Sequence, residues 1–362
     1  MKSRHGWTLI SAGEALRKLK VGARALDVRS PKEFSAAAVP GFTNVPILDD
    51  DHRHQVGIAY KEKGQREAIA LGTALVAPIK DSLTSTFRSH LAPAPPDQRL
   101  LICWRGGLRS QIASEWLADQ GILGLRVQGG YKALRRLLLE DLERPRPFLV
   151  LGGRTGAGKS DLLRAQPPDV ILDLEGLAVH RGSAFGGWPG RPQPRQQTFE
   201  NAIAFTVWES SHLRVVEAES QRIGACTLPH SLRQCMLQGE LVILEADRAD
   251  RARRIFMEYV CTPLKSHARE DVRERLKQSV RAIARALGGA RTQDLLEEMD
   301  QAFAASANSF ECHESWIETL LRDYYDPRYD YALQRTNRRV HFRGDYNAVQ
   351  DYLTGRLGRG RP

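Results

Sequence analysis

A cysteine loop occupies residues 103–110, which read Cys-Trp-Arg-Gly-Gly-Leu-Arg-Ser. Its two glycines allow the backbone to curl so that several N–H groups converge on one anion. The two arginines can add charge-assisted hydrogen bonds, and the positive end of a following helix favours thiolate over thiol. The loop predicts a nucleophilic cysteine in an anion site, the alternative being an inert buried cysteine at a strand end. The candidate residues are Cys103, Arg105, Gly106, Gly107, Arg109 and Ser110.

A second glycine-rich segment runs from Gly153 to Ser160 and fits the pattern G-x-x-x-x-G-K-[ST]. In the context of a strand before and a helix after, such a loop surrounds a diphosphate with backbone N–H groups and a lysine charge. The motif requires a di- or triphosphate but does not by itself establish ATP hydrolysis. Ser160 would be a ligand if Mg²⁺ accompanies the phosphate, and no firm metal site is predicted. The predicted phosphate-binding residues are Gly153, Thr155, Gly156, Gly158, Lys159 and Ser160.

Acidic side chains follow two further apolar runs, at residues 170–172 and 213–216. Mg²⁺ usually takes one or two carboxylates together with phosphate oxygens, so these acids are candidate partners of the phosphate site. Solvated charges at strand ends are the alternative. The four candidates are Asp173, Glu175, Glu217 and Glu219.

A long loop rich in Gly, Pro and Gln covers residues 180–201. Loops of this length are uncommon unless they are functional or disordered, so we expect a substrate loop, and an ordinary surface loop is the alternative. No proton-transfer role is assigned to its histidine. The candidate residues are His180, Arg181 and Ser183.

The elements that must position these loops alternate between strands and helices. Apolar runs at 25–28 and 100–102, with a helical pattern at 110–120, favour an α/β fold with a largely parallel sheet. The prolines within 142–147 predict a domain boundary. Beyond it, strand patterns at 148–151, 170–172, 213–217 and 241–244 predict a second α/β unit, and the chain is helix-rich and heavily charged from Asp247 onward. The predicted domains are residues 1–143, a P-loop α/β core at 144–246, and a helix-rich basic region at 247–362 packed on that core.

The length and composition of the chain limit the classes of protein to which it can belong. A chain of 362 residues is long enough for about two domains. Its longest uncharged apolar stretch, 68–79, is far shorter than the ~20 residues that a membrane helix needs. We therefore expect a cytoplasmic protein without a membrane segment. Five scattered cysteines predict neither a disulfide framework nor a zinc site.

The first half of the chain resembles a rhodanese domain. The resemblance rests on four segments, 27–34, 39–42, 103–110 and 129–131, in the order and spacing of that family. Ala37-Ala38 stand where rhodanese domains usually have Gly-His. The C-x5-R spacing from Cys103 to Arg109 also resembles dual-specificity phosphatases, so a phosphatase stays open for this half.

A rhodanese-like domain followed by a P-loop domain in one chain resembles the tRNA 2-selenouridine synthase family. The resemblance extends from about residue 7 to about residue 353. The further segments that carry it are 56–61, 180–186, 193–194, 197–201, 217–224 and 324–327.

The resemblance implies a two-step modification of the wobble uridine of tRNA. Geranyl diphosphate first S-geranylates 2-thiouridine, and selenium from selenophosphate then replaces the S-geranyl group. The partner implied is a tRNA anticodon loop that carries 2-thiouridine, with the two reagents as co-substrates and no tightly bound cofactor. Lys159 would serve the diphosphate and Cys103 the selenium step. No oligomeric state is predicted.

The formal net charge of +10 agrees with an RNA partner. Trp104, beside the cysteine, could stack on an unpaired base or pack in the core. Candidate phosphate contacts are Arg251, Arg253, Arg254, Lys265, Arg338, Arg339 and Arg343.

Two other functions stay open at this point. One is an ATP-dependent RNA sulfurtransferase, which predicts nucleotide turnover and indifference to geranyl diphosphate. The other is a rhodanese-like phosphatase fused to a P-loop module, which predicts phosphate release that depends on Cys103 and Arg109.

Overall fold

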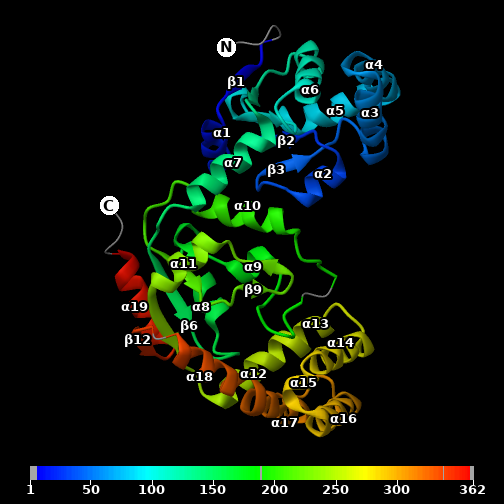
Figure 1. Ribbon diagram of the computed structural model, residues 1–362. Helices are drawn as coiled ribbons and strands as arrows, with labels where there is room; N and C mark the ends of the chain where they lie inside the picture. Colours follow the sequence, from blue (N-terminus) through cyan, green and yellow to red (C-terminus); the bar gives the residue numbers. More distant parts are fainter. Residues whose placement is uncertain (1–5, 188–189, 337, 359–362) are drawn as a thin grey trace. The chain divides into compact units, whose positions relative to one another are not determined.

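The computed structural model describes residues 6–187, 190–336 and 338–358 and divides the chain into two compact units (Figure 1). Unit 1 consists of Met1–Arg144 and Pro194–Trp208, and unit 2 of Pro145–Gln193 and Glu209–Pro362. The predicted P-loop core at 144–246 includes residues 194–208. That assignment is wrong, because this segment packs with the N-terminal unit.

Unit 1 is built on a five-stranded sheet whose strands are all parallel, in the order β1-β5-β4-β2-β3. The apolar residues of the central strands β2 and β4 are completely buried, as is typical of parallel sheets covered on both faces. The strands are β1 (Thr8–Ile10), β2 (Arg24–Asp27), β3 (Phe42–Asn44), β4 (Arg99–Ile102) and β5 (Leu125–Val127).

Three helices of unit 1, α1, α2 and α3, begin at residues whose side chains cap them. The Ser30 hydroxyl accepts from Glu33 N while the Glu33 carboxylate accepts from Ser30 N, a capping box that starts α2. Two helices, α3 and α4, pack side by side as an insertion between β3 and β4 (Figure 1). The helices are α1 (Ala12–Lys20), α2 (Pro31–Ala36), α3 (Asp50–Lys63), α4 (Gln65–Val76), α5 (Lys80–Leu91), α6 (Leu108–Asp119), α7 (Gly130–Leu142) and α10 (Gln196–Val207).

Polar contacts hold α10 in unit 1. The buried Asn201 amide donates to Ala38 O at 2.9 Å, and Ala38 N donates to Thr198 Oγ1 at 3.0 Å. Arg135 of α7 donates to Asn201 Oδ1 at 2.7 Å and pairs with Glu200 at 2.5 Å. Backbone groups that are shielded from water need hydrogen-bond partners, and α10 supplies them to both the carbonyl and the amide of the half-buried Ala38. This explains why a segment from the middle of the P-loop region belongs to unit 1.

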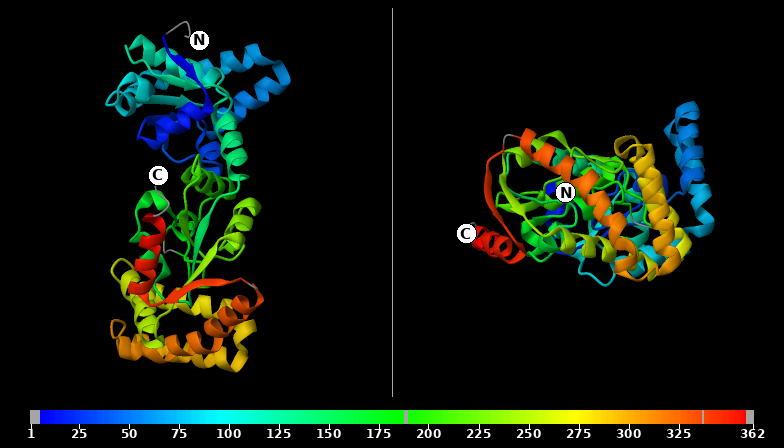
Figure 2. Two further views of the ribbon diagram at one scale, coloured as in Figure 1. Left: turned by 90° about the vertical axis from the view of Figure 1, so that its left-hand side faces the viewer. Right: turned by 90° about the horizontal axis from the view of Figure 1, so that it is seen from below.

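Unit 2 contains a second five-stranded parallel sheet, in the order β12-β11-β6-β8-β7. Its edge strand β12 and the helix α19 come from the C-terminal region at 247–362, which was predicted as a helix-rich region packed on the core and in fact also supplies a strand of the sheet (Figure 2). Leucines of α8 and α19 pack on this sheet. The elements are β6 (Phe148–Gly152), β7 (Ile171–Leu172), β8 (Arg214–Glu217), β11 (Glu240–Leu244), β12 (Val340–Gly344), α8 (Lys159–Arg164) and α19 (Tyr346–Gly358), with a small antiparallel pair β9 (Arg222–Ile223) and β10 (Cys226–Thr227).

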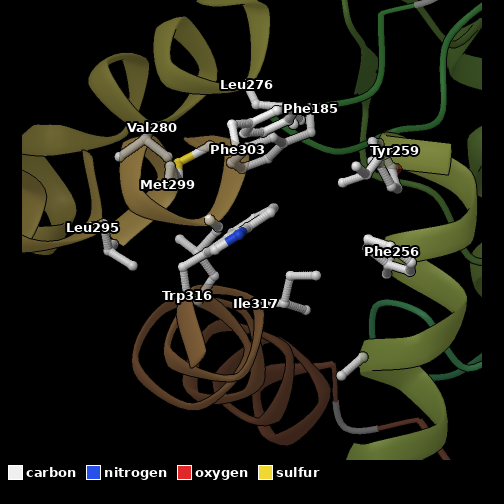
Figure 3. Packing of buried hydrophobic residues seen from close by; sticks show 14 of the residues in the cluster. Phe185, Phe256, Tyr259, Leu276, Val280, Leu295, Met299, Phe303, Trp316 and Ile317 are labelled. Atoms are coloured by element: carbon white, nitrogen blue, oxygen red, sulfur yellow. The ribbon is translucent and has the colours of Figure 1, made fainter. Parts of the chain in front are cut away.

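The rest of unit 2 is helical and has its own apolar core. Trp316 and Ile317 of α17 lie near Phe303 and Met299 of α16, and Phe185 from the loop after α9 joins them (Figure 3). The helices are α9 (Leu174–Ala178), α11 (His230–Gln238), α12 (Arg248–Phe256), α13 (Thr262–Leu264), α14 (Arg269–Ala282), α15 (Ala284–Leu287), α16 (Gly289–Ala305), α17 (Phe310–Leu320) and α18 (Asp326–Arg335), with π-helical turns at Met257–Cys261 and Leu321–Tyr325.

Among the described residues, no helix combines the length and the apolar character needed to cross a membrane.

Candidate active sites

The cysteine loop lies between β4 and α6 of unit 1, the strand–loop–helix context that the sequence predicted. Gly106 has a φ of +66°, and a Cβ there would lie 2.6 Å from the Val127 carbonyl oxygen. Arg126 donates to Gly106 O at 3.1 Å. Only glycine fits this position, because both the dihedral angle and the close backbone exclude a side chain.

Cys103 is almost completely buried, with 3% of its surface exposed. Its Sγ lies 3.3 Å from Ser110 Oγ, and the Ser110 hydroxyl donates to Gly107 O at 3.0 Å. Because the hydroxyl hydrogen is directed at Gly107, the serine oxygen is left to accept from Cys103. This arrangement suits a protonated thiol as the donor.

The two arginines of the loop differ in their surroundings. Arg109 pairs with Glu33 of α2 at 2.5 Å. Burial alone would raise the pKa of the Glu33 carboxyl, but the hydrogen bond and charge of Arg109 outweigh it and the net pKa is lowered. Arg105 is exposed, and no ion pair is found for it in the described part of the chain. Arg105 is therefore the loop arginine that a bound anion can recruit without breaking an ion pair.

Trp104 packs beside the loop. Its ring lies 5.3 Å from that of Tyr131, and the Arg29 guanidinium lies 4.0 Å over the Tyr131 ring. Arg29 is itself buried and bound to Asp27 at 2.7 Å. Trp104 is half-buried against Tyr131 and is not part of the apolar core of unit 1.

The phosphate-binding loop connects β6 to α8 in unit 2. Lys159 Nζ donates to Gly153 O at 2.8 Å, so its charge lies across the loop. Arg254 of α12 donates to Gly156 O at 2.7 Å. The sequence analysis listed Arg254 as an RNA contact, but the structure places it against this loop.

Two acids lie close to the end of the phosphate-binding loop. Ser160 Oγ donates to Glu175 Oε2 at 2.7 Å. Burial, together with the charge of Glu175, raises the pKa of Glu219 to about 7, and the charge of Lys159 opposes the rise. A carboxyl of this kind takes up a proton readily near neutral pH, which reduces its repulsion of a bound phosphate.

The other two predicted acids have structural surroundings. Glu217 is completely buried and accepts from Leu174 N at 3.1 Å, and burial raises its pKa well above the usual value. Asp173 caps α9 by accepting from Gly176 N at 2.7 Å, and it pairs with Arg164 at 2.8 Å. These contacts occupy Asp173 and leave Glu175 and Glu219 as the acids that face the loop.

The described residues contain no group of three or more His, Cys, Asp or Glu side chains arranged to hold a metal ion. Ser160 and Glu175 nevertheless fit the small protein contribution to a Mg²⁺ site in which phosphate oxygens and water supply the other ligands.

The predicted substrate loop, 180–201, is not one continuous loop, because residues 196–201 form the first half of α10 in unit 1. Residues 188–189 of the prediction lie outside the described part of the chain. The segment 180–187, which holds the candidate residues, packs against the helical part of unit 2. Gly182 N donates to His180 Nδ1 at 3.2 Å, and burial lowers the pKa of this histidine, so it is neutral at physiological pH. Arg181 lies 4.8 Å over the Tyr259 ring, and Ser183 Oγ lies 3.3 Å from the Tyr259 hydroxyl.

Arg181 and Ser183, but not His180, line a pocket of about 400 Å³ together with residues of the phosphate-binding loop. The sequence analysis missed its aromatic and charged wall, which comes from the two π-helical turns and the start of α18. Single π-turns inside helices frequently occur at functional sites, but an ordinary helical pattern does not reveal them. The only available signal was the 324–327 segment of the family resemblance. The predicted members are Thr155, Gly156, Gly158, Lys159, Ser160, Glu175, Arg181, Ser183 and Glu219, and the missed ones are Ile255, Glu258, Tyr259, Tyr324, Tyr325, Arg328 and Tyr329.

Several of the basic residues proposed for RNA contacts are engaged elsewhere. Arg251 is buried and makes two hydrogen bonds to Asp326 at 2.7 and 2.8 Å, so its prediction as a phosphate contact is wrong. Arg338 donates to two backbone carbonyls, and Arg343 pairs with Glu245 at 2.8 Å. The exposed candidates that remain are Arg253, Lys265 and Arg339.

Comparison with known proteins identifies the family. Residues 146–359 match the family model described as the tRNA 2-selenouridine synthase AAA domain. The chain is similar to tRNA 2-selenouridine synthase of Cupriavidus pinatubonensis, with 42% identity over 96% of this chain and 99% of the relative. It is 44% identical to the protein of that name from Bordetella petrii, over 93% of this chain and 95% of the relative.

Similarity to solved structures is weaker. The N-terminal domain of an ATP/GTP-binding protein from Clostridium difficile 630 aligns with 36% of this chain and 99% of its own, at 27% identity and a TM-score of 0.33. The sequence relatives, in contrast, cover both units from end to end. The chain therefore belongs to the tRNA 2-selenouridine synthase family and is an enzyme that modifies tRNA.

Proposed function

We propose that this enzyme converts 2-thiouridine at the wobble position of tRNA into 2-selenouridine in two steps, with unit 1 acting as a rhodanese-like domain. The observation that carries the proposal is that the chain holds two different glycine-rich loops between a strand and a helix, one in each unit. The loop of unit 2 presents a lysine, and that of unit 1 presents a buried thiol. The lysine loop of unit 2 suits the stabilisation of a diphosphate leaving group, and the cysteine loop of unit 1 suits the transfer of a soft element such as selenium.

In the first step, the sulfur of 2-thiouridine attacks C1 of geranyl diphosphate. A carbon–sulfur bond forms, the carbon–oxygen bond breaks, and diphosphate leaves while the uridine loses its N3 proton. Negative charge grows on the diphosphate, and Lys159 and the loop N–H groups stabilise it there. Lys159 would exchange its contact with Gly153 O for phosphate oxygens. Ser160 and Glu175 would hold Mg²⁺ if the metal accompanies the diphosphate.

In the second step, selenium of selenophosphate bonds to C2 of the geranylated base. The C2–sulfur bond breaks, geranylthiol leaves, and water then cleaves the phosphorus–selenium bond, which releases phosphate and returns a proton to N3. The cysteine loop would bind the selenophosphate anion through its N–H groups and Arg105. The Cys103 thiol would supply the proton that the departing geranylthiolate takes, and it would recover that proton from solvent.

The RNA partner follows from the same reaction. The anticodon is a single-stranded loop, in which a base can be unstacked and presented to an enzyme. The net charge of +10 and the exposed cations Arg253, Lys265 and Arg339 support attraction of its phosphates.

The proposal is tested by mass spectrometry of nucleosides from tRNA that carries 2-thiouridine. The enzyme is supplied with geranyl diphosphate, selenophosphate, both or neither. We expect S-geranyl-2-thiouridine with the first reagent alone and 2-selenouridine only with both. Unchanged tRNA in every reaction of folded enzyme would refute the proposal. Nucleotide turnover with new thiolation would then favour the sulfurtransferase, and phosphate release that is lost in Cys103→Ala would favour the phosphatase.

A further inference from the structure

Unit 1 contains a second pocket, of about 440 Å³, between the inserted helices α3 and α4 and the start of α6. Small-ligand pockets commonly have 300–1,000 Å³ and mostly apolar walls with a few polar groups. This pocket has that composition, with Gln65, Thr73, Arg109 and Glu115 as its polar members. Its apolar wall includes Val56, Ile69, Val76, Leu108, Ile112 and Trp116.

The pocket begins at the cysteine loop. Leu108 and Arg109 both line it, and they are the first two residues after Gly107. The next residue, Ser110, makes the 3.3 Å contact with Cys103 Sγ. The first turn of α6 therefore borders the cysteine on one side and the apolar pocket on the other.

The pocket is open to a ligand and favours an uncharged one. Leu108 is 41% exposed and Tyr60 is 59% exposed, an unusual degree for large apolar side chains at a pocket wall. The charge of Arg109 is already balanced by Glu33 at 2.5 Å. Transfer of an apolar group from water to such a wall is favourable, whereas a phosphate would have to displace that ion pair.

We infer that this pocket holds the geranyl group of S-geranyl-2-thiouridine during the selenium step. The inference rests on the proposed function, in which the base that reaches Cys103 carries a ten-carbon apolar chain on the reacting sulfur. Binding of that chain beside the loop places the sulfur and C2 near the cysteine. Binding energy from a remote part of a substrate is thereby used to orient its reacting centre.

The test compares binding of anticodon stem–loop RNAs that carry either S-geranyl- or S-methyl-2-thiouridine. Thr73→Trp fills the pocket from an exposed position of α4, where a larger side chain has little effect on folding. The matched control is Ala74→Trp, at the neighbouring exposed position, which is not part of the pocket wall. We expect the wild type and Ala74→Trp to prefer S-geranyl RNA by about tenfold or more because of the buried chain. Thr73→Trp should lose that preference and bind S-methyl RNA normally.

Retention of the full preference by Thr73→Trp would overturn the inference, as would equal weakening of both RNAs. Photo-crosslinking with a diazirine at the end of the geranyl chain provides a readout on the wild-type protein. We expect labelled peptides from residues 56–76 and 108–116, and labels confined to unit 2 would contradict the assignment. If the wild type makes no 2-selenouridine from the geranylated RNA and selenophosphate, the proposed function itself fails.

Discussion

The buried ion pair between Arg251 of α12 and Asp326 of α18 should be essential to the stability of unit 2. Its side chains are 2% and 9% exposed, and its two hydrogen bonds measure 2.7 and 2.8 Å. Asp326→Ala removes one partner and leaves a guanidinium charge buried. Breaking such a pair typically costs about 3–5 kcal/mol in the free energy of unfolding.

The same pair supports the phosphate-binding loop. The carbonyl oxygen of Arg251 lies 2.9 Å from the position that a Cβ on Gly156 would occupy, so α12 packs directly on the loop. Asp326→Ala should therefore weaken diphosphate binding as well as stability. Asp330→Ala is the matched control, because its pair with Arg154 is 2.7 Å long but about half exposed and should contribute about 0–1 kcal/mol.

Urea unfolding monitored by tryptophan fluorescence, to which the buried Trp316 of unit 2 contributes, measures both variants. With a slope of about 1–3 kcal/mol per molar urea, Asp326→Ala should lower the midpoint by roughly 1–5 M. The double variant Arg251→Met/Asp326→Leu should recover most of the loss, since apolar replacement of a whole buried pair is often neutral. If Asp326→Ala lowers the free energy of unfolding by less than about 1 kcal/mol, or if Asp326→Ala and Asp330→Ala lower it equally, the reasoning is refuted.

Three further predictions concern the two sites and α10. The pKa of Glu219 is about 7 in the folded protein against the usual 4.5, so folding takes up a proton; the stability this adds is complete below pH 4.5 and is lost as the pH rises through 7. The free energy of unfolding of Glu219→Gln should therefore equal that of the wild type at pH 4 and exceed it by about 3 kcal/mol at pH 8. Urea unfolding at both pH values measures this, and a difference between the two proteins that does not change with pH would contradict the prediction. Gly106→Ala should abolish selenium incorporation but leave geranylation intact in nucleoside analysis, because its Cβ would lie 2.6 Å from Val127 O; normal incorporation would show that the loop tolerates the side chain. Asn201→Ala should destabilise unit 1 by about 1–3 kcal/mol in thermal or urea unfolding, because it leaves the Ala38 carbonyl without its donor, and a loss below about 0.5 kcal/mol would mean that water replaces it.

Both loops could be predicted from sequence because their signals are local. Gly106 and the glycines of the phosphate-binding loop lie within a few residues of the side chains that they serve, and a strand precedes each loop. The parallel α/β character of both units followed from short apolar runs between helices. These features depend on neighbours along the chain.

What escaped prediction depends on contacts between distant residues. The position of α10 is decided by Asn201 and Ala38, which are 163 residues apart. Along the sequence, Arg251 cannot be distinguished from the other charges of a basic helix, because its ion-pair partner Asp326 is 75 residues away. The edge strand β12 alternates between exposed and half-buried residues and has no apolar run that would distinguish it.

The central claim is that the loop of Lys159 serves geranylation and the loop of Cys103 serves selenium incorporation. The most direct test separates these two steps by supplying tRNA that is already geranylated. Lys159→Ala and Cys103→Ala are each supplied with tRNA carrying 2-thiouridine or its S-geranyl derivative, together with both reagents, and the nucleosides are quantified by mass spectrometry. The account predicts that Lys159→Ala makes 2-selenouridine only from the geranylated tRNA. It predicts that Cys103→Ala geranylates 2-thiouridine and stops there. Failure of Lys159→Ala on geranylated tRNA, or selenium incorporation by Cys103→Ala, would contradict the division of the reaction between the two loops.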